Sequence, residues 1–435
     1  MNEAVEGDVN AASAEGHTAP VAPRRVLLAM LVYNGDTFVP RAIASMARLQ
    51  GLPGEIGPDG KQRAHIVDAL VLDDASPALG WSAALAEQCK QLDVGYYRTP
   101  RNLGIPRNMN LGLLRGEAAG YDYVAILNSD VIFPANMVEG LVAAAESRPG
   151  IASVTAWTNN ASIFSLPNDD PDRWLADSAT VDSISATLTA EFNDETVEIP
   201  VGVGFCLLIS ARAISEVGLF DPVFGRGYCE EVDWCCRAVA AGFTHVLAPG
   251  VFVYHIGSAT NRVAGLLQPG EHTVHTNEAI IDQRHPDYRA RVAAWESSPA
   301  TDAVRPRDAN TAKPGMAPTV ERGLRALVQQ GAAEHGYLVD ATWLRRGALD
   351  PTDRRVRISI NPDGPNPLVE AVADGWRCPV PVGSEGILAG ISAFIGCAPS
   401  EVRLLDHGAI AAALSADAAH AGVPVQSLRR YPERV

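Results

Sequence analysis

The sequence predicts an α/β protein built on a mostly parallel sheet with helices on both faces. The run Arg25–Asn34 is almost continuously apolar up to a polar, glycine-containing turn, which is typical of a strand buried on both faces. Strand-length apolar runs then alternate with segments of helical length, the pattern of a parallel sheet with helical crossovers. These strands stop at polar residues, so ligands are expected beyond the carboxyl edge of the sheet.

The expected elements follow one another in order along the chain. After the first strand, helices are expected at Phe38–Leu49, at Trp81–Gln91 and from Pro106 onward, where proline suits a first helical turn. The strands between them are expected at His65–Leu72, Val94–Arg98 and Tyr121–Leu127. Later strands are expected at Ala152–Trp157, Val201–Ser210 and Gly242–His255.

The length of 435 residues predicts more than one domain, since single hydrophobic cores stop growing at about 250–300 residues. Residues 1–23 contain acidic residues but no Lys or Arg, the reverse of a signal peptide, and are expected to form a disordered leader. The α/β domain is expected over 24–295, a linker rich in Ser, Pro and Asp over 296–318, and an accessory α/β domain over 319–435.

The accessory domain is expected to contain a strand at Val356–Ile360 and helices at Ile387–Phe394 and Ala409–Ala419. The short stretch Asn366–Gly375, followed by Pro379–Gly383, resembles the donor-site helix of GT-B glycosyltransferases, although no second Rossmann unit surrounds it. Acceptor binding and homo-oligomerisation are both open as roles for this domain.

Composition excludes several classes of function. With 35 Lys+Arg against 51 Asp+Glu the formal charge is −16, which argues against nucleic acid and anionic lipid as partners. The 47% of hydrophobic and 20% of charged residues are typical of a globular, soluble protein, and no apolar run approaches the roughly 18 residues of a transmembrane span. The seven cysteines contain no Cys-x-x-Cys pair, which favours reduced thiols and a cytoplasmic location, including a peripheral position at the inner face of a membrane.

Four polar clusters fall where the predicted sheet presents its carboxyl edge. They are Tyr33-Asn34, Asp73-Asp74, Asn128-Ser129-Asp130 and Glu230-Glu231-Val232-Asp233. Each cluster alone could consist of helix caps, for which Asp, Asn and Ser are the favoured residues. Together they predict an acidic site that holds an anionic substrate only with a divalent cation, and oxygen ligands favour Mg or Mn.

Three further segments add candidate contacts to this site. Arg107 and Asn108 lie in a first helical turn, where an arginine can pair with phosphate; a solvated surface role for Arg107 stays open. His255 ends a strand and is either a metal ligand or a structural histidine. The loop Trp157–Asp170, which includes Asn159 and Asn160, suits sugar contacts, and a mobile surface loop is the alternative.

Between Arg25 and about Trp295, six motifs follow one another in an order that is typical of a known protein family. The motifs are Leu31-Val-Tyr-Asn34, Val71-Leu-Asp-Asp-Ala-Ser76, Asn102-Leu-Gly with Arg107-Asn108, Ile126-Leu-Asn-Ser-Asp-Val131, Gly218–Phe224 running into Tyr228–Arg237, and Val253-Tyr-His255. In this order they resemble the family 2 glycosyltransferases, in particular the rhamnosyltransferase-like and galactofuranosyltransferase-like members of bacterial polysaccharide assembly. The resemblance implies the GT-A fold and a reaction that inverts the anomeric centre.

The resemblance also implies a role for each site residue. It places Asp130 and His255 on Mg or Mn, and Glu231 at the position of the general base, with Glu230 and Asp233 as competing candidates. The implied donor-binding residues are Val32, Tyr33, Asn34, Asp73, Asp74, Arg107, Asn108, Asn128 and Ser129. Two residues depart from the family pattern: Asn128 stands for the first Asp of Asp-x-Asp, and Glu231 stands for Asp.

The implied reaction moves a sugar from a UDP- or dTDP-sugar to a hydroxyl of a glycan, lipid-linked or natural-product acceptor. Such a site must stabilise charge on the leaving diphosphate and deprotonate the acceptor. Because Asn128 and Glu231 depart from the pattern, a catalytically silent GT-A module that binds sugar nucleotide or glycan is the alternative. A nucleotidyltransferase is disfavoured, since Leu31–Asp36 is not a glycine-rich basic phosphate loop.

Overall fold

The computed structural model describes residues 22–35, 38–77, 79–161, 163–166, 177–193, 195–255 and 273–307, and in the C-terminal part 329, 332–334, 336–340, 356–361, 368–373, 376–379, 386–404 and 409–427. The predicted leader therefore lies almost entirely outside the described residues, as do positions 308–318 of the predicted linker.

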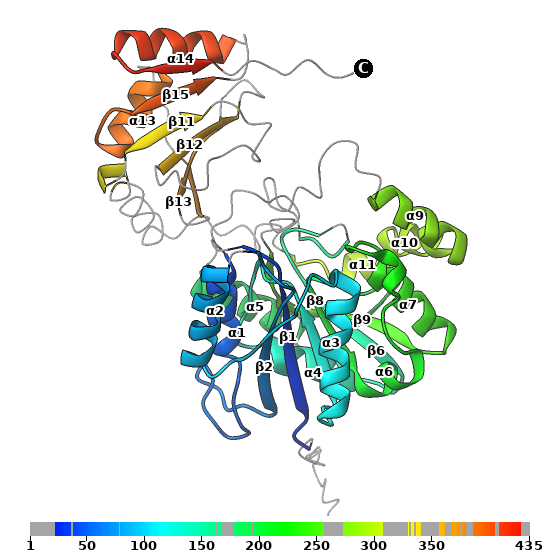
Figure 1. Cartoon of the computed structure of the whole chain (residues 1–435). Coiled ribbons are helices and arrows are strands. Elements are labelled where there is room, and N and C mark those ends of the chain that lie inside the picture. Colours follow the sequence, from blue (N-terminus) through cyan, green and yellow to red (C-terminus); the bar gives the residue numbers. More distant parts are fainter. Residues whose placement is uncertain are drawn as a thin grey trace, which may run out of the picture.

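Strands and helices alternate through the first part of the chain (Figure 1). They are β1 (Arg25–Val32), α1 (Val39–Ala47), β2 (Ile66–Asp73), α2 (Leu79–Gln91), β3 (Gly95–Arg98), α3 (Ile105–Ala118), β4 (Tyr123–Leu127), β5 (Val131–Ile132), α4 (Met137–Glu146), β6 (Ile151–Trp157), α5 (Ser178–Phe192), β7 (Val197–Ile199), β8 (Cys206–Ser210), α6 (Ala211–Val217), the 3-10 helix η2 (Pro222–Phe224), α7 (Glu230–Ala240), β9 (Thr244–Phe252), β10 (Tyr254–His255), α9 (Thr273–Arg284), α10 (Tyr288–Glu296) and α11 (Pro299–Ala303).

The central sheet has eight strands in the order β3-β2-β1-β4-β8-β6-β9-β7 among the described residues. Strands β3, β2, β1 and β4 are mutually parallel, and β9 is parallel to β6. Strand β8 runs antiparallel between β4 and β6, and β7 runs antiparallel to β9. The predicted α/β class with a mostly parallel sheet is confirmed.

Both faces of the sheet are covered, as the apolar run at β1 indicated. Val26, Leu28 and Met30 pack on one face with α1 and α4, while Leu27 and Ala29 pack on the other face with α3, α6 and α7. This alternation follows from the two-residue period of a strand. Burial of each such side chain stabilises the fold by roughly 1.5–3 kcal/mol. The packed core therefore determines where the strands end and where the carboxyl edge of the sheet lies.

The antiparallel strand β8 brings a loop to the carboxyl edge of the parallel strands. Leu127 at the end of β4 pairs with Cys206 at the start of β8, so residues 201–205 lie beside the end of β4. The strand predicted at Val201–Ser210 therefore begins only at Cys206. Its first half is a loop, and that loop reaches the candidate site.

The C-terminal part forms a second sheet, drawn as a separate group of elements in Figure 1. Its elements are β11 (Tyr337–Asp340), β12 (Val356–Asn361), β13 (Leu368–Ala373), β14 (Trp376–Pro379), α13 (Ile387–Ile395), β15 (Glu401–Leu404), α14 (Ala409–His420) and β16 (Val425–Ser427). The strand and two helices predicted here are confirmed. The likeness of Asn366–Gly375 to a donor-site helix is wrong, because β13 pairs antiparallel with both β12 and β14.

Part of the predicted linker is folded against the first sheet. The short helix α11 lies within it, and Val304 is buried in the cluster that also contains Trp157 and Phe164. No described helix is both long enough and apolar enough to cross a membrane.

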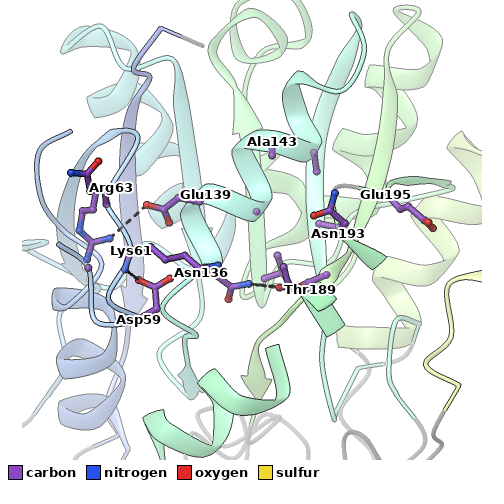
Figure 2. A pocket seen from close by; sticks show the side chains of 16 residues that line it. Asp59, Lys61, Arg63, Asn136, Glu139, Ala143, Thr189, Asn193 and Glu195 are labelled. Carbon is purple, nitrogen blue, oxygen red and sulfur yellow. Dashed lines mark hydrogen bonds and ion pairs between the residues drawn. The ribbon is translucent and has the colours of Figure 1, made fainter. Parts of the chain in front are cut away.

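A cavity of about 310 Å³ opens between the loop 57–63, α4, the end of α5 and β9 (Figure 2). Arg63 and Glu139 face each other there at 3.8 Å, and Asn136 donates to Thr189 Oγ1 at 2.8 Å. The lining residues include none of those predicted to bind donor or metal or to act as base. The predicted site residues therefore lie outside this cavity.

Candidate active site

Asp130 and His255, the two predicted metal ligands, lie side by side although they are far apart in sequence. Their segments pair as the antiparallel strands β5 and β10, with His255 opposite Val131. As a result, Asp130 Oδ1 lies 3.3 Å from His255 Nε2, and the side chains are 5% and 12% exposed. Asn128, two residues before Asp130, places its Nδ2 3.5 Å from the same ring nitrogen.

The loop after β6 determines which way the His255 ring points. Nδ1 lies 2.6 Å from the carbonyl oxygen of Asn160, and since a carbonyl only accepts, Nδ1 must carry a proton. Asn159 brackets the backbone of His255, accepting from its N–H at 2.8 Å and donating to its carbonyl at 2.9 Å. The Phe205 ring stacks on the imidazole at 5.4 Å between centroids. Nε2 is thereby turned toward Asp130.

This arrangement fits a divalent cation. Adjacent ligands of an octahedral Mg or Mn ion lie about 3 Å apart, close to the separation of Asp130 Oδ1 and His255 Nε2. Histidine ligands commonly donate their second ring nitrogen to a carbonyl, as Nδ1 does here to Asn160. Among the described residues no group of three His, Cys, Asp or Glu side chains surrounds one point, so the remaining ligands would come from substrate and water. Burial lowers the pKa of His255, but Asp130 and the hydrogen bond to the Asn160 carbonyl together outweigh burial, so this pKa is raised overall.

Asp73 and Asp74 are buried at the end of β2 and are bound largely by the chain itself. Asp73 accepts from the Ser76 backbone at 2.9 Å, from Ser82 Oγ at 2.9 Å and from the Tyr96 hydroxyl at 2.7 Å. Asp74 accepts from the backbone N–H groups of Leu103 at 2.7 Å and Gly104 at 2.9 Å. Burial raises the pKa of Asp74 despite these hydrogen bonds, which act to lower it. Both side chains therefore organise the loops at this edge.

The other predicted donor residues occupy the same edge with different exposure. Val32 and Ser129 are buried, and Tyr33 and Asn34 are half-buried; Asn34 has a left-handed φ of 59° and donates its N–H to Ser76 Oγ at 2.9 Å. Arg107 is exposed at the first turn of α3. Asn108 is 2% exposed, and its Oδ1 is without a hydrogen-bond partner. The first turn of α3 thus contains both the exposed guanidinium of Arg107 and the buried, unpaired amide oxygen of Asn108.

The acidic cluster lies at the start of α7, and its three carboxylates have different surroundings. Glu231 accepts a hydrogen bond from the Gly204 backbone, and its Oε2 is buried without a partner. Glu230 is 4% exposed and its Oε2 is likewise unpaired. Burial raises the pKa of Glu231; burial and then the Glu231 charge raise that of Glu230 well above the ordinary value. No Lys, Arg or His side chain is among the causes that shift either pKa.

The loop before β8 links this acidic pair to the Asp130–His255 pair. Gly204 contacts Glu231, while the next residue, Phe205, accepts from the Asn128 N–H at 3.0 Å and stacks on His255. The two sites predicted as metal centre and base are therefore joined through two consecutive residues. Neither Gly204 nor Phe205 was among the predicted site residues.

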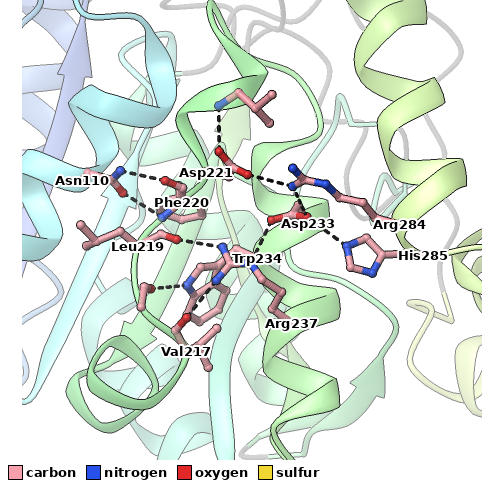
Figure 3. A network of polar contacts seen from close by, with 12 residues as sticks. Asn110, Val217, Leu219, Phe220, Asp221, Asp233, Trp234, Arg237, Arg284 and His285 are labelled. Atoms are coloured by element: carbon pink, nitrogen blue, oxygen red, sulfur yellow. Dashed lines mark hydrogen bonds and ion pairs between the residues drawn. The ribbon is translucent and has the colours of Figure 1, made fainter.

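Asp233 lies in the same first turn of α7 but in a network of its own (Figure 3). It is 1% exposed and contacts Arg237 at 2.9 Å, Arg284 at 3.1 Å and His285 at 3.0 Å. Burial alone would raise the pKa of Asp233, but the hydrogen bonds from His285, Arg237 and Arg284 lower it overall. These contacts connect α7 to Arg284 at the end of α9 and to His285, which follows that helix.

Gly104 places the start of α3 against the loop before α7. Its φ is +82°, and a Cβ built on it would lie 2.2 Å from the Gly225 carbonyl oxygen. We expect Gly104→Ala to destabilise the protein by about 2–4 kcal/mol, since a left-handed residue costs about 1–2 kcal/mol and the clash adds to this. Chemical denaturation measures this change. Gly150→Ala, at a φ of +85° with open space around it, is the matched control and should show the backbone cost alone.

The comparisons with known proteins give a family match and distant structural similarities. Residues 28–218 match the model described as Glycosyl transferase family 2. The search of curated proteins found no match. Among solved structures, the chain is similar to GalNAc-T7 with UDP, GalNAc and Mn2+, at 14% identity and a TM-score of 0.43, covering 63% of this chain and 50% of that one. The chain thus spans half the length of that protein.

Two further structures are similar over most of their length. One is the mannosyltransferase PcManGT from Pyrobaculum calidifontis in complex with GDP-Man and Mn2+, at 17% identity and a TM-score of 0.38, covering 73% of this chain and 82% of that one. The other is TarS 1-349 of S. aureus, at 11% identity and a TM-score of 0.37, covering 63% and 75%. Residues 28–218, less than half of the chain, are thus similar to family 2 glycosyl transferases, and they lie within the α/β unit with the mostly parallel sheet.

Proposed function

We propose that this protein transfers a sugar from a nucleotide-diphosphate donor to an acceptor hydroxyl, with inversion at the anomeric carbon. The observation that carries the proposal is the pair Asp130 and His255, with Oδ1 and Nε2 3.3 Å apart at the carboxyl edge of the sheet. The family match over residues 28–218, which includes Asp130, supports it. In this proposal the two side chains would hold Mn or Mg, which would stabilise negative charge on the donor diphosphate.

The donor would lie along the edge formed by the ends of β1, β2 and β4. The backbone and side chains of Val32, Tyr33 and Asn34 would meet the nucleoside, while Asp73 and Asp74 hold the surrounding loops. Asn128 and Ser129 would flank the diphosphate. The exposed Arg107 at the start of α3 would meet a polar group of the sugar nucleotide, while the neighbouring Asn108 is buried with an unpaired Oδ1.

A bound cation would offset the charge that develops on the leaving diphosphate. The chain must then remove a proton from the acceptor hydroxyl. Glu231 is our candidate for this base, because its Oε2 is unpaired and Gly204 ties it to the Asp130–His255 pair. Glu230 is the second candidate. We assign Asp233 a structural role, since three cationic or imidazole groups already bind it.

The test is slow hydrolysis of a panel of UDP-, dTDP- and GDP-sugars, including rhamnosyl and galactofuranosyl donors, with added Mn. We expect release of nucleoside diphosphate from one donor class, its loss on chelation and its recovery with Mn or Mg. The same donor is then offered to glycan and lipid-linked acceptors, and the anomeric configuration of the product is determined. Tight donor binding without turnover for any donor or acceptor would instead favour the catalytically silent module.

A further inference from the structure

The loop that leads into the acidic pair has a strained backbone. Gly225, Gly227, Tyr228 and Cys229 have positive φ values of 61°, 118°, 70° and 75°, and Glu230 follows directly as the first residue of α7. Non-glycine residues in this region cost about 1–2 kcal/mol each. Two of them in succession persist only when surrounding contacts hold them. The position of Glu231 therefore depends on whatever holds this loop.

Asn277 of α9 supplies such contacts. Its Nδ2 lies 3.1 Å from the carbonyl oxygen of Phe224, 2.9 Å from that of Gly227 and 2.9 Å from that of Tyr228. The residue is 4% exposed. Because carbonyl groups only accept hydrogen bonds, the amide nitrogen and not the amide oxygen must face them. One side chain thus binds three carbonyls of the loop within five residues.

The opposite side of the loop rests on α3. A Cβ built on Gly227 would lie 2.5 Å from Ile105 Cδ1, and Gly104 approaches Gly225 as closely. On the α9 side, Arg284 at the end of the helix and His285 directly after it bind Asp233 at 3.1 and 3.0 Å. The loop and the first turn of α7 are therefore held between α3 and the α9 segment.

We propose that Asn277 is the positioning residue that holds loop 224–229 and thereby sets the location of the Glu231 carboxylate. The inference rests on the proposed function through the assignment of Glu231 as base. Asn277 lies outside the part matched by the family model, which ends at residue 218. Its role follows from its three carbonyl contacts and from the left-handed Tyr228 and Cys229, which directly precede Glu230.

The test compares Asn277→Ala with Gln50→Ala. Gln50 is a side-chain amide that likewise binds backbone groups, those of Ala69 and Leu92, but at a distant part of the sheet. In Asn277→Ala we expect kcat for transfer to fall by about 10–100-fold with donor KM changed by less than about threefold, since a displacement of about 1 Å can cost 10²-fold. The acidic limb of the kcat profile should move to lower pH, because a less buried Glu231 has a lower pKa. Gln50→Ala should leave both unchanged.

A second readout does not depend on activity. Cys229 lies inside the loop, and burial raises the pKa of its thiol to about 12, so alkylation should be slow in the native protein. In Asn277→Ala, peptide mapping should find Cys229 alkylated about tenfold faster or more, with amides of 225–231 exchanging faster. Asn277→Asp keeps the volume of the side chain but turns an acceptor toward three carbonyls, so it should behave like Asn277→Ala.

Unchanged alkylation and exchange in a folded Asn277→Ala variant would overturn the holding role. Faster alkylation with unchanged kcat and pH profile would overturn the link to Glu231. If the native protein turns over no donor, the proposed function fails, and the role of Asn277 in holding the loop is then decided by alkylation and exchange alone.

Discussion

Replacing Asp130 by alanine is expected to lower sugar-nucleotide turnover by at least about 10³-fold and to weaken Mn binding. The substitution removes one of the two donor atoms that face each other at 3.3 Å and leaves His255 as the remaining side-chain ligand. Without the cation, charge on the leaving diphosphate would be stabilised only by exposed cations such as Arg107, which act in a high dielectric. Turnover and Mn affinity, measured by titration, check this prediction.

Two controls separate loss of the ligand from loss of the fold. Asp68→Ala removes an exposed carboxylate of β2 that accepts a hydrogen bond from the Tyr121 hydroxyl, and it should retain full turnover. Asp130→Asn keeps the shape of the side chain but supplies a weaker ligand, so its turnover should rise with Mn concentration. Native Mn affinity in a folded Asp130→Ala protein would remove Asp130 from the metal site.

Replacing Glu231 by glutamine is expected to lower transfer by about 10²–10⁴-fold while donor binding stays within about threefold of native. A positioned general base contributes about that factor, and the amide keeps the volume and the hydrogen bond from Gly204. Donor affinity by calorimetry and transfer by product analysis are the two measurements. Transfer at the native rate would exclude Glu231 as the base.

The pH dependence follows from the direction of the pKa shift. Burial raises the pKa of Glu231 above its ordinary value of 4.5, and a base must be ionised to accept a proton. Transfer should therefore fall as pH decreases through the raised pKa, in a range where an exposed glutamate would still be ionised. Glu231→Gln should lack this limb.

Glu230→Gln is the matched variant for the neighbouring carboxylate. Its ionised form is disfavoured by burial and by the Glu231 charge, so removal of that charge should raise the melting temperature at neutral pH. If Glu231 is the base, transfer should fall far less in this variant. A larger loss in Glu230→Gln than in Glu231→Gln would reverse the assignment of the two.

Local sequence patterns predicted most strands of the first sheet. The apolar run at β1, the alternation that follows and the proline at the start of α3 depend on neighbours in sequence, and the elements lie within a few residues of their predicted places. The strand predicted from Val201 was placed five residues too early, because Val201 and Phe205 are buried by contacts of the loop and not by pairing within the sheet.

Side chains that act through distant partners could not be predicted in the same way. Asn277 has no motif around it, and its three carbonyl partners are 49 to 53 residues away. Asn159 and Asn160 were noticed for sugar contacts, whereas in the structure they hold His255. The composition of a loop indicates what it can bind, but not which backbone groups will face it.

The sequence by itself determined the α/β class, the order of the elements from β1 to β4 and the acidic residues after the strands, because hydrophobic periodicity and strand ends are local properties. Only the tertiary structure decided how those residues are used. Asp130 lies beside His255 because β5 and β10 pair. Asp233, by contrast, forms ion pairs with Arg237, Arg284 and His285. Glu230 and Glu231 keep unpaired oxygens. The physical reason is that pairing between segments distant in sequence depends on which surfaces the core brings together, and no spacing along the chain encodes it.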